Sequence, residues 1–177
     1  MRGRKLLYSG DERTRPMKDR VREAVFNLLG PAVAGKHAID LFAGTGALAF
    51  EAISRGAARG TFIEQHFPTA RLIRQNAVLL GIGDRAQVHP ANTFIWVQKN
   101  DLALDEPWLV FCSPPYAFYV ERHAQMLALI GALLERAPPT SILVVEADDR
   151  FDTSGLSDAA AWEIRQYPPA VVAIYRK

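Results

Sequence analysis

From residue 38 onward, short apolar runs alternate with stretches of helical periodicity, and this alternation restricts the fold more than any other feature. The apolar runs, which are rich in Val, Ile and Phe, occupy residues 38–43, 60–64, 86–90, 108–112 and 141–147. The helical patterns occupy residues 47–55, 69–80, 93–98 and 120–136. Strands separated by helices form crossover units, in which the strands are parallel and helices cover both faces of the sheet. The sequence therefore predicts an α/β fold with a doubly wound, mainly parallel sheet.

The two ends of the chain depart from this alternation. Residues 162–177, WEIRQYPPAVVAIYRK, have the pattern of two strands joined by a tight turn at Pro168-Pro169, which predicts an antiparallel hairpin and a sheet of seven strands. Residues 17–30 have apolar residues at helical spacing and end in Gly30 before Pro31, which predicts an amphipathic helix. At 177 residues we expect one domain, with residues 1–22 as its arm and residues 23–177 as its body.

The composition excludes several classes of protein. With 49% hydrophobic and 23% charged residues, the chain has the composition of a globular protein rather than a disordered one. Its single cysteine, Cys112, lies in an apolar run, so we expect a buried side chain rather than a nucleophile. One cysteine and four scattered histidines give no metal-ligand spacing. The sequence has neither an apolar leader nor a run long enough to span a membrane, so we expect a soluble, cytoplasmic protein.

The net charge of +2 is distributed unevenly along the chain. Residues 1–22 hold eight basic and three acidic residues, whereas the remainder of the chain is net acidic. A local basic segment favours a polyanion partner such as nucleic acid, although a solvated basic tail has the same composition. The candidate phosphate-binding residues are Arg2, Arg4, Lys5, Arg13, Arg15, Lys18, Arg20 and Arg22.

The ends of the first two predicted strands hold candidate ligand-binding residues. In DLFAGTGALAFEA, residues 40–52, two glycines allow a sharp turn and close approach of the backbone to a ligand. The acidic residue before the turn suits a ligand that carries an amine, and the acidic residue ending the second strand is placed to accept both hydroxyls of a ribose. A nucleoside with an amino-acid tail, such as S-adenosylmethionine, meets both requirements. The candidate residues in these segments are Asp40, Phe42, Gly44, Gly46, Glu64 and Gln65.

The run FCSPPYAFY, residues 111–119, ends a predicted strand with two prolines. Proline cannot donate to a sheet ladder and holds its predecessor in an extended conformation, so a rigid loop follows the strand. This fixes the directions of the Ser113 hydroxyl and of the adjacent backbone carbonyls. A strand-ending turn with a packed tyrosine has the same local pattern.

In this order, DLFAGTGAL, FIE and SPPY resemble the motifs of class I S-adenosylmethionine-dependent methyltransferases that act on amino groups of nucleobases. The segments RGRKL, RPMKDRVREAVFNLLG and IYRK are similar to those of the RsmD type, which methylates a guanine N2 in bacterial small-subunit (16S) ribosomal RNA. The resemblance covers nearly the whole chain. It implies a Rossmann-like fold, S-adenosylmethionine as cofactor, and ribosomal RNA or the assembling small subunit as partner of the basic arm. It also implies direct methyl transfer without a metal.

The resemblance also implies roles for individual residues. Asp40 and Gly44 would lie near the methionine portion of the cofactor, and Glu64 would bind its ribose. The catalytic loop would consist of Ser113, Pro114, Pro115 and Tyr116. The hydroxyl of Ser113 and the carbonyl of Pro114 would accept hydrogen bonds from the target amino group, and Tyr116 would stack on the extruded base.

This chain departs from the family pattern at two positions. Ser113 stands where the family usually has aspartate, and Asn92, in HPANTF, stands where an aspartate usually contacts the adenine. Asparagine keeps an oxygen acceptor for the adenine amino group, whereas a neutral serine gives weaker electrostatic help than a carboxylate. Two alternatives therefore stay open: methylation of an adenine N6 in DNA or RNA, and a degenerate relative that binds RNA during ribosome assembly.

Other polar residues near strand ends carry weaker expectations. We interpret Glu146 as a residue that only caps a strand edge, and Asp148 and Asp149 as solvated loop charges. His66 and His89 are interpreted as loop histidines with satisfied hydrogen bonds.

Overall fold

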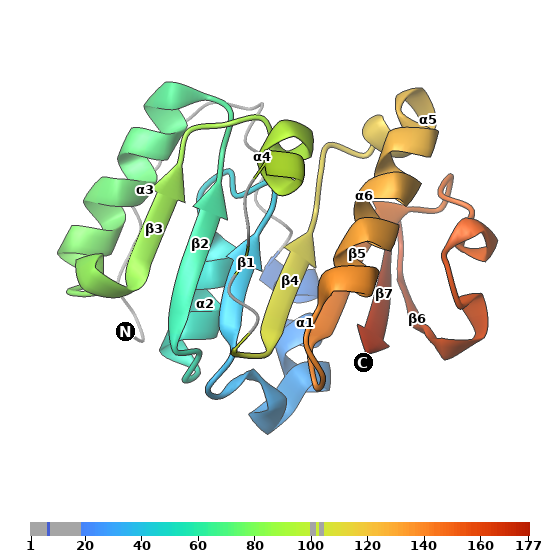
Figure 1. Ribbon diagram of the computed structural model, residues 1–177, viewed down its shortest axis with the longest axis horizontal. Helices are drawn as coiled ribbons and strands as arrows, with labels where there is room; N and C mark the ends of the chain where they lie inside the picture. The colour runs from blue at the N-terminus through green and yellow to red at the C-terminus, as the bar shows by residue number, and fades with distance from the viewer. Residues whose placement is uncertain (1–6, 8–18, 100–101, 103–104) are drawn as a thin grey trace.

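The computed structural model describes residue 7, residues 19–99, residue 102 and residues 105–177 (Figure 1). Seven strands form one sheet in the order β3-β2-β1-β4-β5-β7-β6. The strands are β1 (His37–Asp40), β2 (Arg59–Ile63), β3 (Ala86–His89), β4 (Trp108–Cys112), β5 (Ile142–Asp148), β6 (Glu163–Tyr167) and β7 (Ala170–Arg176). The first five strands in chain order are parallel, and β7 is antiparallel to both β5 and β6. The predicted fold class is therefore confirmed, including the C-terminal hairpin.

Helices cover both faces of the sheet, as Figure 1 shows. Their bounds are α1 (Asp19–Leu29), α2 (Ala47–Ser54), α3 (Phe67–Leu79), α4 (Thr93–Lys99), α5 (Phe118–Glu121) and α6 (His123–Arg136). Buried residues of α1, α2 and α3, such as Phe26, Phe50 and Ile73, form one core cluster with one face of the sheet. Buried residues of α4 and α6, such as Trp96 and Met126, form a second cluster on the other face. Burial on both faces explains why the central strands are apolar throughout.

The helix predicted at residues 120–136 is divided in two. Arg122, with φ −127° and ψ 30°, separates α5 from α6, and its conformation lies outside the helical region. The periodicity of apolar residues continues through this break, so it gives no signal of the interruption. Every helix within the described residues is too short or too polar to cross a membrane.

The order of the strands determines where a ligand can bind. The chain runs outward from β1 through β2 to β3, then returns across the sheet to β4 on the other side of β1. In open α/β sheets, ligands bind at such a reversal, outside the carboxyl ends of the strands. The loops that follow β1 and β4 are therefore the expected walls of a site.

Candidate active site

Asp40, the last residue of β1, has a buried carboxyl group without a hydrogen-bonding partner in the described part of the chain. The residue is 1% exposed, and neither carboxyl oxygen accepts a hydrogen bond from the described residues. Burial, together with the nearby charge of Glu64, raises the pKa of Asp40 to about 7, although the amides of Ala49 and Phe42 offset part of this effect without completing a hydrogen bond. Since buried polar groups are normally paired, this carboxyl group is placed to receive a donor from a ligand.

The two glycines after β1 have left-handed backbones, with φ +51° at Gly44 and +78° at Gly46. A Cβ at Gly46 would lie 2.8 Å from Cε2 of Phe50, whereas a Cβ at Gly44 would meet only the Phe42 carbonyl oxygen at 4.0 Å. Gly46 is therefore required by packing. Gly44, in contrast, borders open space where a ligand can approach the backbone.

Substitution of each glycine by alanine tests whether packing requires Gly46 but not Gly44. Gly46→Ala should lower the free energy of unfolding by about 2–4 kcal/mol, because it adds a steric clash to left-handed strain. Gly44→Ala, the matched control, should cost about 1 kcal/mol, because it adds strain without a clash. Urea denaturation measures both, and equal destabilisation by the two variants would contradict this assignment.

Glu64, directly after β2, holds the glycine loop. Its Oε2 accepts a hydrogen bond from the Gly44 amide at 2.8 Å, and its Oε1 accepts one from the His66 amide at 2.7 Å. Each carboxylate oxygen keeps a second lone pair, so these bonds leave capacity for ribose hydroxyls. Gln65, the next residue, is exposed.

Asn92 caps helix α4. Its Oδ1 accepts hydrogen bonds from the backbone amides of Phe94 at 3.0 Å and Ile95 at 3.3 Å. The sequence alone did not indicate this capping role, although Asn is a favoured N-cap residue. These bonds fix the side-chain carbonyl of Asn92 just after β3, at the same carboxyl ends of the strands where Asp40 and Glu64 lie.

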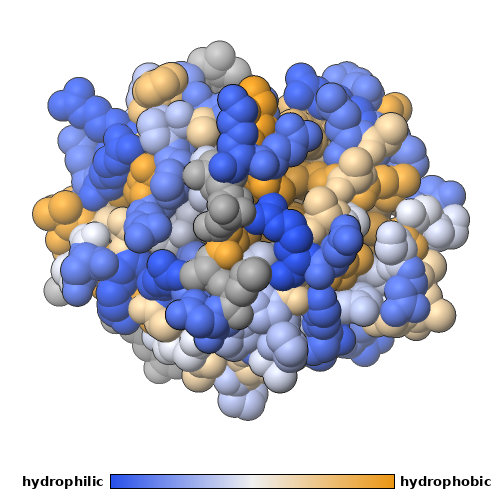
Figure 2. Space-filling model, in the orientation of Figure 1, coloured by the Kyte–Doolittle hydropathy of each residue, from blue (hydrophilic) through white to orange (hydrophobic). Residues whose placement is uncertain are grey.

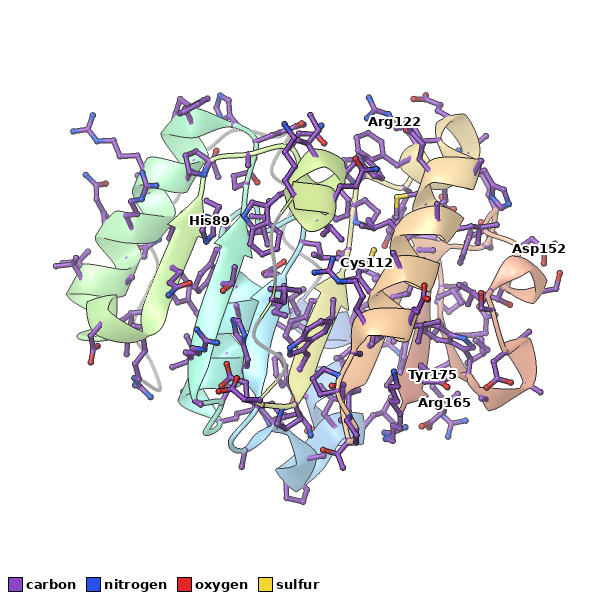
Figure 3. The ribbon with its side chains drawn as sticks, in the orientation of Figure 1. His89, Cys112, Arg122, Asp152, Arg165 and Tyr175 are labelled. Carbon is purple, nitrogen blue, oxygen red and sulfur yellow. The ribbon has the colours of Figure 1, made fainter. Side chains whose placement is uncertain are left out.

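An aromatic cluster lies beside these residues. Phe42 packs against Phe94 and Phe118 in edge contacts, with ring centroids 6.1 Å apart in each pair. The guanidinium of Arg122 lies 4.4 Å from the centre of the Phe118 ring, and Figure 3 shows Arg122 near α5 at this end of the sheet. Figure 2 shows hydrophobic surface, bordered by hydrophilic residues, over the region of α4 to α6.

The loop after β4 is bound to the neighbouring strand β5 through Glu146. The Ser113 hydroxyl donates to Oε2 of Glu146, and the Tyr116 hydroxyl donates to Oε1 at 2.8 Å. Glu146 is 3% exposed. Our interpretation of Glu146 as a strand-edge cap is therefore wrong, because its carboxyl group binds two of the four residues of the SPPY loop. The carboxylate within the apolar strand sequence ILVVEAD is the sequence signal for a buried charge, although it does not reveal which residues bind that charge.

The two residues that bind this carboxyl group, Ser113 and Tyr116, are half-buried. Burial raises the pKa of Glu146, and the two hydrogen bonds from Ser113 and Tyr116 offset part of that effect. Burial, together with the adjacent Glu146, raises the pKa of Tyr116.

The interpretation of Asp148 as a solvated charge is also wrong. Asp148 ends β5, is 7% exposed and forms an ion pair with Arg150 at 2.6 Å.

Cys112, the last residue of β4, is buried as predicted, beneath α6 (Figure 3). Burial raises the pKa of its thiol to about 12, so it is inert as a nucleophile at neutral pH.

Most of the predicted phosphate-binding arm lies outside the described residues, including Arg2, Arg4, Lys5, Arg13, Arg15 and Lys18. At the start of α1, Arg20 is exposed and Arg22 forms an ion pair with Asp19 at 2.8 Å. The backbone of Leu7 is bound to Asn76 of α3: its amide donates to Oδ1 at 2.8 Å, and its carbonyl accepts from Nδ2 at 3.1 Å. Within the described residues, His, Cys, Asp and Glu form no group that could hold a metal ion.

Comparison with known proteins identifies relatives over nearly the full length. The family model described as conserved hypothetical protein 95 matches residues 1–176. The chain is 38% identical to YlbH of Bacillus subtilis, over 99% of this chain and 95% of that one. It is 33% identical to ribosomal RNA small subunit methyltransferase D of Haemophilus influenzae, over 83% of this chain and 75% of that one.

The solved structure of yhhF from Escherichia coli has the same fold. It matches with a TM-score of 0.79 and 28% identity, and the match covers 99% of this chain and 93% of that one. Together with the family match, these relationships show that the chain belongs to the family of RsmD-type methyltransferases.

Proposed function

We propose that this protein transfers a methyl group from S-adenosylmethionine to the N2 amino group of a guanine in small-subunit ribosomal RNA. The observation that carries this proposal is the proximity of two features at the carboxyl edge of adjacent strands. Asp40 pairs in register with Phe111, so its carboxyl group lies next to the strand that leads into Ser113. Within the described residues this carboxyl group accepts no hydrogen bond. A cofactor bound at Asp40 would therefore meet a base held at the SPPY loop.

The residues around β1 and β2 fit S-adenosylmethionine. The buried carboxyl group of Asp40 has no donor among the residues that the structure describes, and the amino group of the methionine portion would provide one. Gly44 leaves open space beside the loop, and Glu64 retains lone pairs for the ribose hydroxyls. Phe42 would pack against the cofactor, and Gly46, Gln65 and Asn92 complete the proposed set. When bound, the cofactor supplies a methyl group on a positively charged sulfur.

The SPPY loop would hold the target base. A guanine amino group is a weak nucleophile because its lone pair is delocalised into the ring, so its orientation toward the methyl group contributes much of the rate. The Ser113 hydroxyl and the Pro114 carbonyl would accept hydrogen bonds from this amino group, while Pro115 keeps the loop rigid. Tyr116 would contact the face of the extruded base, with its hydroxyl held by Glu146.

The basic arm, residues 1–22, would bind the phosphates of the RNA. Its charge of +5 contrasts with a net acidic remainder of the chain, which supports a polyanion partner. The name of the Haemophilus influenzae relative supports small-subunit ribosomal RNA as that partner.

Calorimetry and methyl transfer test the proposal on the same sample. We expect the purified protein to bind S-adenosylhomocysteine, and to transfer labelled methyl from S-adenosylmethionine to small subunits from cells that lack the protein. Naked 16S RNA, assayed in parallel, distinguishes a free-RNA substrate from an assembled one. Cofactor binding without transfer to either substrate would reject the proposed acceptor, and absence of cofactor binding would reject the proposed activity.

A further inference from the structure

We infer that Glu146 accepts, through the Ser113 hydroxyl, the proton that the target amino group loses on methylation. The inference deepens the proposed function and rests on it. In this assignment Glu146 supplies, from the neighbouring strand, the carboxylate that the SPPY sequence lacks at its first position. Glu146 itself does not touch the substrate, so it is a positioning residue and proton acceptor that acts through Ser113.

The pairing of β4 with β5 brings the two residues together. Cys112 pairs in register with Val145, so Ser113 and Glu146 are the next residues along two adjacent parallel strands. Side chains at corresponding positions of paired strands point to the same face of the sheet. The hydrogen bond from Ser113 Oγ to Glu146 Oε2 is the result. Because β5 is buried along its whole length, this geometry is built into the sheet rather than into a surface loop.

The burial of Glu146 is unfavourable for the stability of the fold. The residue is 3% exposed, and its hydrogen-bond partners among the described residues are two hydroxyl groups rather than a lysine or arginine. Burying a carboxylate without a cation is unfavourable, and an apolar residue of similar size would suit a central strand better. A carboxyl group held at this position by two residues of the SPPY loop is better explained by chemistry than by packing.

The hydrogen bond to Glu146 fixes the direction in which the Ser113 hydroxyl donates its proton. A hydroxyl has one proton to donate and two lone pairs. Since the proton is directed to Glu146, the lone pairs are left to accept a hydrogen bond from another donor. The target amino group is such a donor when the base lies at the loop. The Tyr116 hydroxyl, bound to Oε1, fixes the carboxyl group so that Oε2 stays directed at Ser113.

The proton balance of the step is complete. As the bond between the amino nitrogen and the methyl carbon forms, the bond between that carbon and sulfur breaks, and positive charge develops on the nitrogen. The nitrogen then releases one proton to Ser113 Oγ, which passes its own proton to Oε2 of Glu146. The products are a neutral methylated amine, a neutral thioether and a protonated Glu146, which returns its proton to solvent after product release.

The surroundings of Glu146 favour this role. The groups that face it are the Ser113 and Tyr116 hydroxyls. Beyond them, the charge of Asp148 contributes to the raised pKa of Tyr116, and the charge of Glu146 contributes to the raised pKa of the buried Tyr119. Burial raises the pKa of Glu146 and thereby makes its carboxylate a stronger base than an exposed one.

Four variants test the relay: Glu146→Gln, Ser113→Ala, the double variant Ser113→Ala/Glu146→Gln, and Ser113→Asp/Glu146→Gln. Each is assayed for kcat and KM with small subunits, for affinity toward S-adenosylhomocysteine, and for melting temperature. Glu163→Gln, a distant surface change on β6, is the matched control and should keep wild-type kinetics.

We expect Glu146→Gln to lower kcat by roughly 100-fold, with KM and S-adenosylhomocysteine affinity changed less than about threefold. The double variant should be no slower than the slower single variant, because both changes remove the same relay. Ser113→Asp/Glu146→Gln should recover at least about tenfold over Glu146→Gln, because the aspartate carries its own carboxylate to the amine. A purely structural role for Glu146 would not give this recovery.

Three results would overturn the relay: wild-type kcat in Glu146→Gln, multiplying losses in the double variant, or no recovery with Ser113→Asp. These outcomes are distinct from failure of the proposed function. If the wild-type protein transfers no methyl group to small-subunit RNA, the proposed function fails and the relay with it. If the wild-type protein is active and Glu146→Gln is equally active, only the relay fails.

Discussion

Asp40→Asn is expected to weaken S-adenosylhomocysteine binding by at least about 100-fold, because loss of one partner of a buried ion pair costs about 3–5 kcal/mol. The same variant should become more stable than the wild type as pH rises. Asp40, whose pKa is about 7, holds its proton in the folded state between pH 4 and 7, where the unfolded chain has lost it. Wild-type stability therefore falls as pH rises through this window, and asparagine removes that penalty.

Calorimetric titration with S-adenosylhomocysteine measures the first effect. Urea denaturation of the free protein at pH 4, 6 and 8 measures the second. The stability difference between Asp40→Asn and wild type should grow by on the order of 4 kcal/mol between pH 4 and pH 8, because the pKa of Asp40 is raised from 3.8 to about 7 on folding. Asp84→Asn, at an exposed position, is the control and should show neither effect. Cofactor affinity unchanged in Asp40→Asn would remove Asp40 from the proposed cofactor site, whatever happens to stability.

Neutralising the arm is expected to produce the largest change in RNA affinity. Replacing Arg2, Arg4, Lys5, Arg13 and Arg15 by glutamine removes five cations while keeping the chain length and the Leu7 contact with Asn76. Each lost phosphate contact reduces the slope of log affinity against log salt by about 0.7–0.9, so the slope should fall by roughly 4. Filter binding of small-subunit RNA between 50 mM and 200 mM salt measures this change.

Two comparisons make the arm experiment specific. Arg85→Gln removes one exposed cation just before β3, at the amino ends of the parallel strands, whereas the site lies at their carboxyl ends. This variant should leave the salt slope unchanged. S-adenosylhomocysteine affinity should be unaffected in the arm variant. If the arm variant keeps the wild-type affinity and slope, the arm is a solvated tail and RNA is bound elsewhere.

The fold could be predicted because its signals are local and repeated. Each buried parallel strand is apolar along its length, each crossover helix has its own periodicity, and the prolines mark the hairpin turn. The division between α5 and α6 could not be predicted, since it depends on the backbone conformation of Arg122 alone and leaves the apolar pattern intact.

The location of the candidate site residues was predictable where one segment of sequence carries them. Asp40, the glycine turn and the SPPY loop are adjacent in sequence to the strand ends that position them. Glu146 was missed because its role depends on the register of β4 with β5, which a single strand sequence does not specify. The capping role of Asn92 was missed because a helix N-cap and the proposed adenine contact both require a side-chain oxygen at this position. The residue type therefore does not distinguish the two roles.

Nucleoside analysis of the methylated RNA identifies the base and the atom that the protein methylates. Small subunits from cells lacking the protein are incubated with the purified protein and labelled S-adenosylmethionine, and the RNA is digested to nucleosides and separated with mass detection. We expect the label to appear in N2-methylguanosine and to be lost in Asp40→Asn. Label in N6-methyladenosine, or no label in a protein that binds S-adenosylhomocysteine, would rule out guanine N2 as the methylated atom.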